Sequence, residues 1–563
     1  MIQLGISAFY HDAAACLVKD GKVLLAAEEE RFTEVKHDAS FPTNAIQWLL
    51  EESRIKIQDI DEVCWYENPD KKKDRVISTF NKRPIRTLFQ RRKFYKEQKE
   101  HSPELLLQAI GFTGPILYTD HHLSHSAFSY YTSNYESAAI LTVDGVGEWE
   151  TVTISIGEGN TIKQVSSINF PHSLGMLYST ITAYLGFKPN EGEYKVMGLA
   201  PYGDPLKYRD KLLKVFEKTT KNKFWINQKY FTWEYSDKIM FNRRLGKLLG
   251  FSPRLSEEEV TQDHKDLAAS LQSVYEEYFV RLVKSSKNMT KESNLCIGGG
   301  CAYNGVANYK AYDTFDSVHI PFAPSDAGSA IGSCLYQYYV KNEKRKRVPN
   351  SNPYLGPQFS NSEVKVVLKQ YKDRVQAYKL SEEKLIQKTA DLLYNQQIVA
   401  WFQGRMEFGA RALGNRSILA SPALPEMRER LNHVIKKREG FRPFAPSIVE
   451  EQAPLFFELK ESVPYMNVVS HAKRVNHVIP FKAATHINGT CRVQTVNELQ
   501  NKRYYDLLQA FKHRSGAGVL LNTSFNLKDQ TITMTPQQAI ERFLDSKINF
   551  LVIGNYLLAK NTQ

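Results

Sequence analysis

The sequence lacks any apolar run of about 18 residues or more, so it offers no segment that would cross a membrane as a helix. Its first residues, MIQLGISAFYHD, also lack the basic region and unbroken apolar stretch of a secretory signal peptide. We therefore expect a cytoplasmic protein with no membrane partner. Hydrophobic residues make up 42% of the chain and charged residues 24%, which excludes a disordered composition.

Cysteine is scarce: six residues are scattered over 563 positions, and no pair has C-x-x-C spacing. This pattern excludes a disulfide framework and a cysteine-rich zinc site. Positive charge is in excess, with a net charge of +13. Such an excess fits either a nucleic-acid partner or a site that holds phosphate-rich substrates. Much of it lies in residues 70–100, which we interpret as a solvated helical insert, so we do not expect a nucleic-acid partner.

Two segments of the N-terminal half share one layout. Residues 2–30 read as strand, polar turn, strand, turn and strand, and residues 136–167 repeat this order around an acidic, glycine-rich turn. A duplicated α/β domain with a cleft between its halves is the actin/Hsp70/sugar-kinase arrangement. Between residues 340 and 360 the composition changes to Lys and Arg, then to Asn, Ser, Pro and Gly. We predict a domain of residues 1–350 and a second α/β domain of residues 351–563.

Two histidines indicate a metal site. His121 and His125 stand four residues apart where a strand ends and a helix begins, so they share one helical face. Histidines at a helix start also serve as caps or packed side chains. Asp144 and Asp326 lie at the predicted end of a strand or start of a helix, where a cleft-facing oxygen ligand would sit. Two imidazoles with carboxylates suit ferrous iron, manganese or zinc, and the sequence does not choose among them.

The segment CIGGGCAYNGVAN places Gly299 and Gly300 between an apolar strand and a helix-like stretch. Glycine permits close approach of the backbone, and a helix N-terminus favours an anion. A triple glycine can also be only a tight turn. Because it follows the duplicated layout, we predict a turn that contacts a nucleotide, with Asn304 as a polar contact.

The C-terminal half has cations in apolar, turn-rich segments, where such side chains usually meet an anion. These residues are Arg411, Arg416, Lys436, Arg442 and Arg492. Asn522 and Ser524 follow the strand GVLL, where binding groups commonly project. In the N-terminal half, the first hairpin turn holds His11 and Asp12. Lys36 and His37 follow an acidic run that could equally be a solvated face.

Several of these segments together carry a resemblance. They are GISAFYHDAAACLVKDG, DHHLSHSAFSYY, LTVDGVGE, GGGCAYNGVAN, PSDAGSAIG, GRMEFGARALGNRSILASP, KKREGFRPFAPS and LLNTSFN. The chain resembles, end to end, the NodU/CmcH family of O-carbamoyltransferases, which includes the tobramycin, cephalosporin and nodulation-factor enzymes.

The resemblance implies an N-terminal domain similar to tRNA threonylcarbamoyl transferases and a C-terminal domain similar to threonylcarbamoyl-adenylate synthases. The C-terminal domain would convert carbamoyl phosphate and ATP, the latter with magnesium, to a carbamoyl-adenylate. Phosphate and pyrophosphate would be released there, with the cations as phosphate ligands. A hydroxyl of a small-molecule acceptor, a natural product or a sugar, would then attack in the N-terminal domain, and AMP would leave.

The resemblance also assigns residues. His121, His125, Asp144 and Asp326 match the family's metal ligands, with ferrous iron as the first expectation, and His11 and Lys36 match residues near the acceptor site. Two alternatives remain: a tRNA threonylcarbamoyl transferase, and a nucleotide-binding regulator without catalysis. The sequence predicts neither the acceptor nor the oligomeric state.

Overall fold

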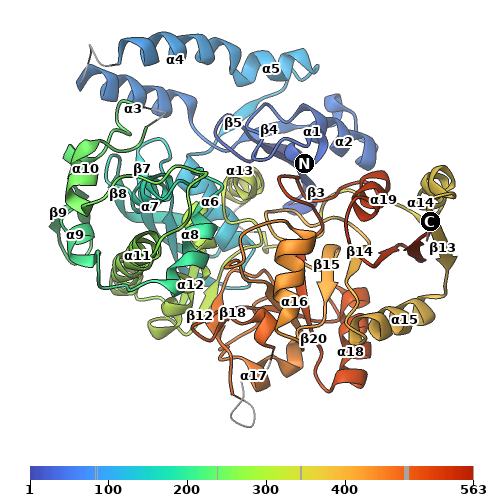
Figure 1. The fold of residues 1–563 in the computed structure, drawn as a ribbon. Helices are drawn as coiled ribbons and strands as arrows, with labels where there is room; N and C mark the ends of the chain where they lie inside the picture. Colours follow the sequence, from blue (N-terminus) through green and yellow to red (C-terminus); the bar gives the residue numbers. More distant parts are fainter. Residues whose placement is uncertain (83, 85–86, 237–238, 343–344, 475–480, 562–563) are drawn as a thin grey trace. The chain divides into compact units, whose positions relative to one another are not determined.

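The computed structural model describes residues 1–563 except 83, 85–86, 237–238, 343–344, 475–480 and 562–563. The chain forms two compact units (Figure 1). The first unit comprises Met1–Glu29 and His37–Ser351, and the second comprises Glu30–Lys36 and Asn352–Gln563. The sequence did not predict that the short segment Glu30–Lys36, with helix α1 (Glu30–Thr33), would belong to the second unit.

The described part of the first unit contains two five-stranded sheets with the same topology. One has the order β3-β2-β1-β4-β5, and the other has the order β8-β7-β6-β11-β12. Each begins with an antiparallel meander and adds two parallel strands beside its first strand. The first sheet has strands β1 (Ile2–Ser7), β2 (Ala14–Lys19), β3 (Lys22–Glu28), β4 (Glu62–Trp65) and β5 (Ile116–Tyr118). The second has β6 (Ser137–Val143), β7 (Glu150–Glu158), β8 (Thr161–Asn169), β11 (Asn294–Gly298) and β12 (Ser317–His319). The predicted duplication is confirmed.

Two helices pack together at the centre of this unit. Helix α6 (His121–Tyr131) lies on the second sheet, and helix α13 (Asp326–Lys341) lies on the first. Their backbones approach closely because α13 carries glycine at the contact: a Cβ on Gly332 would lie 2.0 Å from the carbonyl oxygen of Ser124. The small residues of α13 therefore bring the start of α6 and the start of α13 to one place.

The remaining elements of the first unit surround this centre. They are α2 (Thr43–Ser53), α3 (Pro69–Lys82), α4 (Leu88–Glu100), α5 (Pro103–Ala109), α7 (Leu174–Tyr184), α8 (Glu193–Leu199), α9 (Arg209–Leu213), β9 (Phe216–Thr219), β10 (Phe224–Ile226), α10 (Arg243–Leu249), α11 (Gln262–Thr290) and α12 (Gly305–Tyr309). The predicted helical insert corresponds to α3 and α4. No helix in the described ranges is long and apolar enough to span a membrane.

The second unit is built on a mixed sheet whose described strands follow the order β13-β22-β21-β14-β15-β20-β16-β19. Alternate residues of β14 face opposite sides: Val399 and Trp401 pack with helices α15 and α18, and Ala400 and Phe402 pack with α14 and α19. Both faces are therefore covered. Its helices are α14 (Asn361–Leu368), α15 (Glu382–Tyr394), α16 (Glu426–Glu429), α17 (Ala453–Phe456), α18 (Lys502–Ser515) and α19 (Pro536–Leu544). Its strands are β13 (Val375–Lys379), β14 (Val399–Phe402), β15 (Arg416–Ala420), β16 (Ala445–Val449), β17 (Val469–His471), β18 (Thr490–Arg492), β19 (Gln494–Val496), β20 (Val519–Ser524), β21 (Phe550–Ile553) and β22 (Tyr556–Lys560).

Candidate metal centre and anion site

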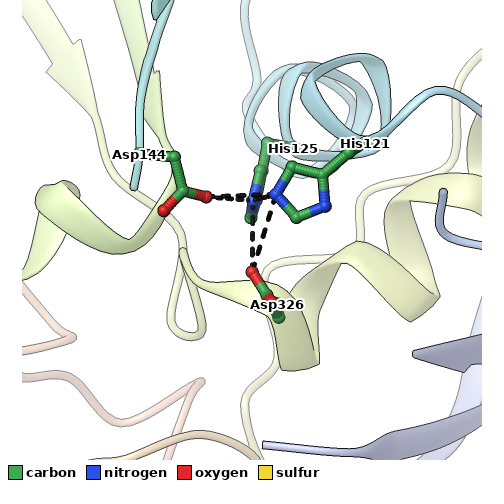
Figure 2. Close-up of side chains that lie close together, drawn as sticks. All are labelled: His121, His125, Asp144 and Asp326. Carbon is green, nitrogen blue, oxygen red and sulfur yellow. Dashed lines mark hydrogen bonds and ion pairs between the residues drawn. The ribbon is translucent and has the colours of Figure 1, made fainter. Parts of the chain in front are cut away.

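The four predicted metal ligands come together in the first unit (Figure 2). His121 and His125 project from the first turns of α6, Asp144 follows β6, and Asp326 begins α13. The Nε2 atoms of the two histidines are 3.1 Å apart. Asp144 Oδ2 lies 3.2 Å from His121 Nε2 and 2.8 Å from His125 Nε2. Asp326 Oδ1 lies 3.8 Å and 3.5 Å from the same two atoms.

These separations fit a single metal ion. Four ligands at about 2.0–2.1 Å from a tetrahedral centre lie about 3.3–3.4 Å from one another, close to the distances between these donors. Both side-chain oxygens of Asp326 are buried, and no described residue donates a hydrogen bond to them. Buried carboxylate oxygens without donors need another partner, and a cation supplies one. The donor set therefore fits a divalent metal, and it contains two nitrogen and two oxygen ligands.

The histidines and aspartates of the cluster stabilise each other's charged forms. Burial alone would lower the pKa of His125, but the carboxylates of Asp144 and Asp326 beside its ring raise it to about 9. Burial alone would raise the pKa of Asp144, but His121 and His125 hold it well below its usual range. Ser329 Oγ lies 2.9 Å from His125 Nδ1 and fixes the orientation of that ring.

His122 differs from its two histidine neighbours on α6. Its Nδ1 contacts the hydroxyl of Thr142 at 2.6 Å instead of joining the cluster. Burial and the nearby His121 lower the pKa of His122 to about 3, so its ring is neutral. The i and i+4 spacing therefore separated the two ligand candidates from the packed histidine between them.

The glycine-rich turn lies against the strand end that carries Asp144. Gly299 has φ +90°, and a Cβ there would lie 2.3 Å from the carbonyl oxygen of Val143. A Cβ on Gly300 would lie 3.2 Å from Asp144 Oδ1. Asn304 is used within the protein: its side chain caps α12 and forms paired amide hydrogen bonds with Gln272. The two glycines thus border the metal centre, whereas the amide of Asn304 already has partners.

His11 also borders this centre. Its Nε2 lies 3.8 Å from Asp326 Oδ2, and its Nδ1 lies 2.9 Å from Asp12 Oδ2. The second oxygen of Asp12 contacts His37 Nδ1 at 2.7 Å. Burial would lower the pKa of His11, but the charges of Asp326 and Asp12 raise it to about 10. We named Asp12 and His37 only as neighbours of His11 and Lys36, and the structure shows that they hold the His11 ring in place.

Glu148 is a residue that we did not predict. Its carboxylate accepts the backbone N–H of His121 at 2.9 Å and 3.0 Å and that of Asn68 at 2.6 Å. The N-cap residue of α6, Asp120, makes no side-chain capping bond. Glu148 therefore caps the helix that carries both histidines. Its only sequence signal is its place four residues after Asp144 in TVDGVGE.

We expect Glu148→Gln to weaken metal binding by roughly tenfold, because the amide removes the charge and presents a donor to the N–H of His121. Titration calorimetry of the metal-free chain with Mn²⁺ or Zn²⁺ measures this change. Glu150→Gln makes the same chemical change two residues away and should leave the affinity unaltered. Equal affinities for both variants and the wild type would remove Glu148 from the metal site.

The second unit gathers cations around Lys436. This lysine is buried, and its Nζ donates to the carbonyl oxygen of Ser524 at 2.5 Å and to the backbone and side-chain oxygens of Asn526 at 2.9 Å and 2.7 Å. Burial lowers the pKa of Lys436 well below its usual range, and nearby cations lower it further. These cations are Arg438, Arg442, Lys36 and Arg542. An anion would relieve this concentration of positive charge.

The structure also shows the contacts of three other residues predicted to bind an anion: Arg416, Asn522 and Arg492. Arg416 is fully buried, and its guanidinium donates to the carbonyl oxygens of Gln403, Gly404, Asn415 and Pro357. Both terminal nitrogens of this guanidinium therefore bind the backbone of the free protein, and its role as an anion ligand stays a prediction. Asn522 Nδ2 donates to the carbonyl oxygen of Ala412 at 3.2 Å, which holds the segment next to Arg411. Arg492 is the last residue of β18. Burial is the main cause that lowers the pKa of His486 to about 4, and the positive charge of Arg492 lowers it further.

Lys36 belongs to the second unit and adds its charge to the surroundings of Lys436. Its role as an acceptor-site residue stays a prediction. Ser524 also lies at this cluster, because its carbonyl accepts from Lys436 and its Oγ donates to Asn526 at 2.8 Å. Neither Arg438 nor Arg542 was predicted, although Arg438 stands between Lys436 and Arg442 in KKREGFRPF.

Comparison with known proteins gives the family. A model described as the carbamoyltransferase N-terminus matches residues 2–335, and one described as the carbamoyltransferase C-terminus matches residues 390–560. An uncharacterized protein of Synechocystis sp. is 39% identical over 100% of this chain and 97% of its own. Nodulation protein NolNO of Sinorhizobium fredii is 34% identical over 98% and 80%, and nodulation protein U of Rhizobium fredii is 27% identical over 92% and 88%. The chain therefore belongs to the carbamoyltransferase family and is a carbamoyltransferase.

Proposed function

We propose that the protein is an ATP-dependent O-carbamoyltransferase with two chemical sites. In the second unit, water cleaves carbamoyl phosphate to carbamate and phosphate, and the carbamate oxygen then attacks the α-phosphate of ATP to give a carbamoyl-adenylate and pyrophosphate. The first unit transfers the carbamoyl group to a hydroxyl of a small-molecule acceptor, a natural product or a sugar, and releases AMP. The observation that carries this proposal is the presence of a four-ligand donor set in one unit and of a cation cluster around the buried Lys436 in the other.

In the second unit, the cations neutralise the phosphates as ATP reacts. Lys436 and Arg442 act from the buried cluster, and Lys36 adds to its charge. Arg411 and Arg492 are proposed as further phosphate ligands, with magnesium bound to ATP. Asn522 acts through Arg411, because it holds the neighbouring carbonyl of Ala412. Ser524 orients Asn526, which accepts from Lys436.

In the first unit, His121, His125, Asp144 and Asp326 would hold a divalent metal, with ferrous iron proposed first and manganese or zinc as alternatives. Such a metal would supply a Lewis acid for the AMP phosphate and the carbamoyl oxygen. Gly299 lets this turn pack against the backbone of Val143, and Gly300 places no side chain beside Asp144, so we propose that the nucleotide contacts the turn here. His11 Nδ1 is hydrogen-bonded to Asp12, whereas its Nε2 lies 3.8 Å from Asp326, beyond hydrogen-bond distance, so we propose that the Nε2–H donates to the carbonyl oxygen as charge develops there.

The test is incubation of the chain with ATP, carbamoyl phosphate and a pool of hydroxylated acceptors. We expect AMP and pyrophosphate in equal amounts, both dependent on carbamoyl phosphate, and a product heavier than its acceptor by one carbamoyl group in the mass spectrum. Threonine-dependent ATP use with modification of tRNA would favour the threonylcarbamoyl alternative instead. Binding of ATP without consumption under all conditions would favour the regulator.

A further inference from the structure

The proposed function makes no use of the most basic part of the chain. Residues 69–100 contain twelve Lys and Arg and four Asp and Glu, so they carry a net +8 of the total +13. Their described residues form α3 and α4, which lie at the periphery of the first unit (Figure 1). No described residue of α4 is buried. This helix therefore adds charge and surface without adding to the core.

One face of α4 is occupied by the protein itself. The ring of Phe94 packs edge-on against Phe80, with centroids 6.0 Å apart. Arg91 donates to Asn81 Oδ1 at 2.8 Å, and Gln90 Nε2 donates to the carbonyl oxygen of Tyr235 at 3.2 Å. These contacts fix which way the helix faces.

The outer face of α4 includes Leu88, Phe89, Arg92, Tyr95, Lys96 and Lys99, together with Glu100, which forms an ion pair with Lys96 at 3.6 Å. Leu88, Arg92, Lys96 and Lys99 follow one stripe at i, i+4, i+8 and i+11, away from Phe94. Leu88 is 58% exposed, Phe89 is 84% exposed and Tyr95 is 52% exposed. Two adjacent large apolar side chains thus stand in water beside a row of cations.

Exposed apolar side chains beside a row of cations indicate which kind of partner would bind the outer face of α4. A single-stranded nucleic acid would attract the cations and stack on Phe89 and Tyr95, but it offers no apolar contact to Leu88. A second copy of the chain would bring the same positive charge to the contact, which is repulsive. An anionic bilayer offers both partners: negative headgroups for the cations and a boundary with the acyl chains for Leu88 and Phe89.

We propose that the outer face of α4 docks on an anionic lipid surface. This goes beyond the proposed function and does not depend on it. The expectation of no membrane partner rested on the lack of a spanning segment, and a helix that lies in the interface needs none. Apolar insertion at Leu88 and Phe89 and attraction at the three cations act together, as two weak signals commonly do.

The test is co-sedimentation of the full chain with vesicles of phosphatidylcholine alone and with vesicles that also contain about 30% phosphatidylglycerol. We expect binding to the anionic vesicles only, weakened by salt. The variant L88S/F89S should lower the partition coefficient at least about tenfold, because it removes the apolar contact. The variant R92Q/K96Q/K99Q should lower it by roughly 100-fold.

The matched control is K372Q/K384Q/K388Q, which removes three exposed cations from the second unit and should bind as the wild type does. All variants should keep the wild-type rate of AMP formation with a soluble acceptor, so loss of docking is distinguished from failure of the proposed function. Four results would overturn the proposal: no binding, equal binding to neutral vesicles, unchanged binding of both outer-face variants, or tRNA binding that replaces vesicle binding. Dimerisation abolished by L88S/F89S, without vesicle binding, would assign the face to a second copy instead.

Discussion

We expect a His121→Ala chain to lose carbamoyl transfer by roughly 10³-fold, because a Lewis acid contributes several kcal/mol to such a step. The substitution removes one of four ligand atoms that lie within 4.8 Å of one another. Exchange of labelled pyrophosphate into ATP should continue at the wild-type rate, because the proposed site of adenylate formation is in the second unit. Transfer is measured by carbamoylated product and exchange by label in ATP.

Two further variants make this expectation sharp. Asp326→Asn keeps the volume of the side chain but removes its charge, so it should lose transfer and metal even where the fold is unchanged. His122→Ala makes the same change as His121→Ala one residue away, at a ring that contacts Thr142 and not the cluster. It should keep most of the transfer activity. If His121→Ala lost pyrophosphate exchange as well as carbamoyl transfer, the proposal that the two reactions take place in different units would be wrong.

The sequence predicted the ligand set because its signals are local. Four-residue spacing on a helix places His121 and His125 on one face whatever the rest of the chain does. The two meanders were also predictable, since alternating strands with polar turns are short-range patterns. Their common sheet order, with two parallel strands added to each, confirms the duplication that those patterns indicated.

The parts that were missed depend on distant contacts. Glu148 caps α6 although it lies 27 residues beyond His121, and no spacing rule connects a turn to a preceding helix. Lys36 follows an acidic run, and only the tertiary structure places it with the second unit. Arg416 shows a different limit. A cation in a glycine-rich segment looks the same in sequence whether it meets a phosphate or the carbonyl oxygens of its own backbone.

The second large effect is expected at Lys436. Lys436→Met should lower carbamoyl-adenylate formation by roughly 10²- to 10³-fold, because it removes the central charge of the cation cluster proposed to stabilise the reacting phosphates and releases Ser524 and Asn526, which Lys436 holds. Overall transfer should fall equally, since the first unit then receives no intermediate. Lys437→Met is the matched control, because its side chain is exposed and the same change is made one residue away. Pyrophosphate exchange and the melting temperature are measured for both.

The lowered pKa of Lys436 gives a test in the unaltered chain. ATP favours the charged lysine, so its affinity should be highest below the lowered pKa and should decline as the pH rises through it, before the usual range near 10.5. Above that pKa, binding should take up a proton, which calorimetry detects in two buffers of different ionisation enthalpy. The sign for folding is opposite: the unfolded chain binds more protons between the lowered and the usual pKa, so stability should rise with pH there. Lys436→Met should remove both dependences, and if it kept them, another cation of the cluster would be the group that titrates.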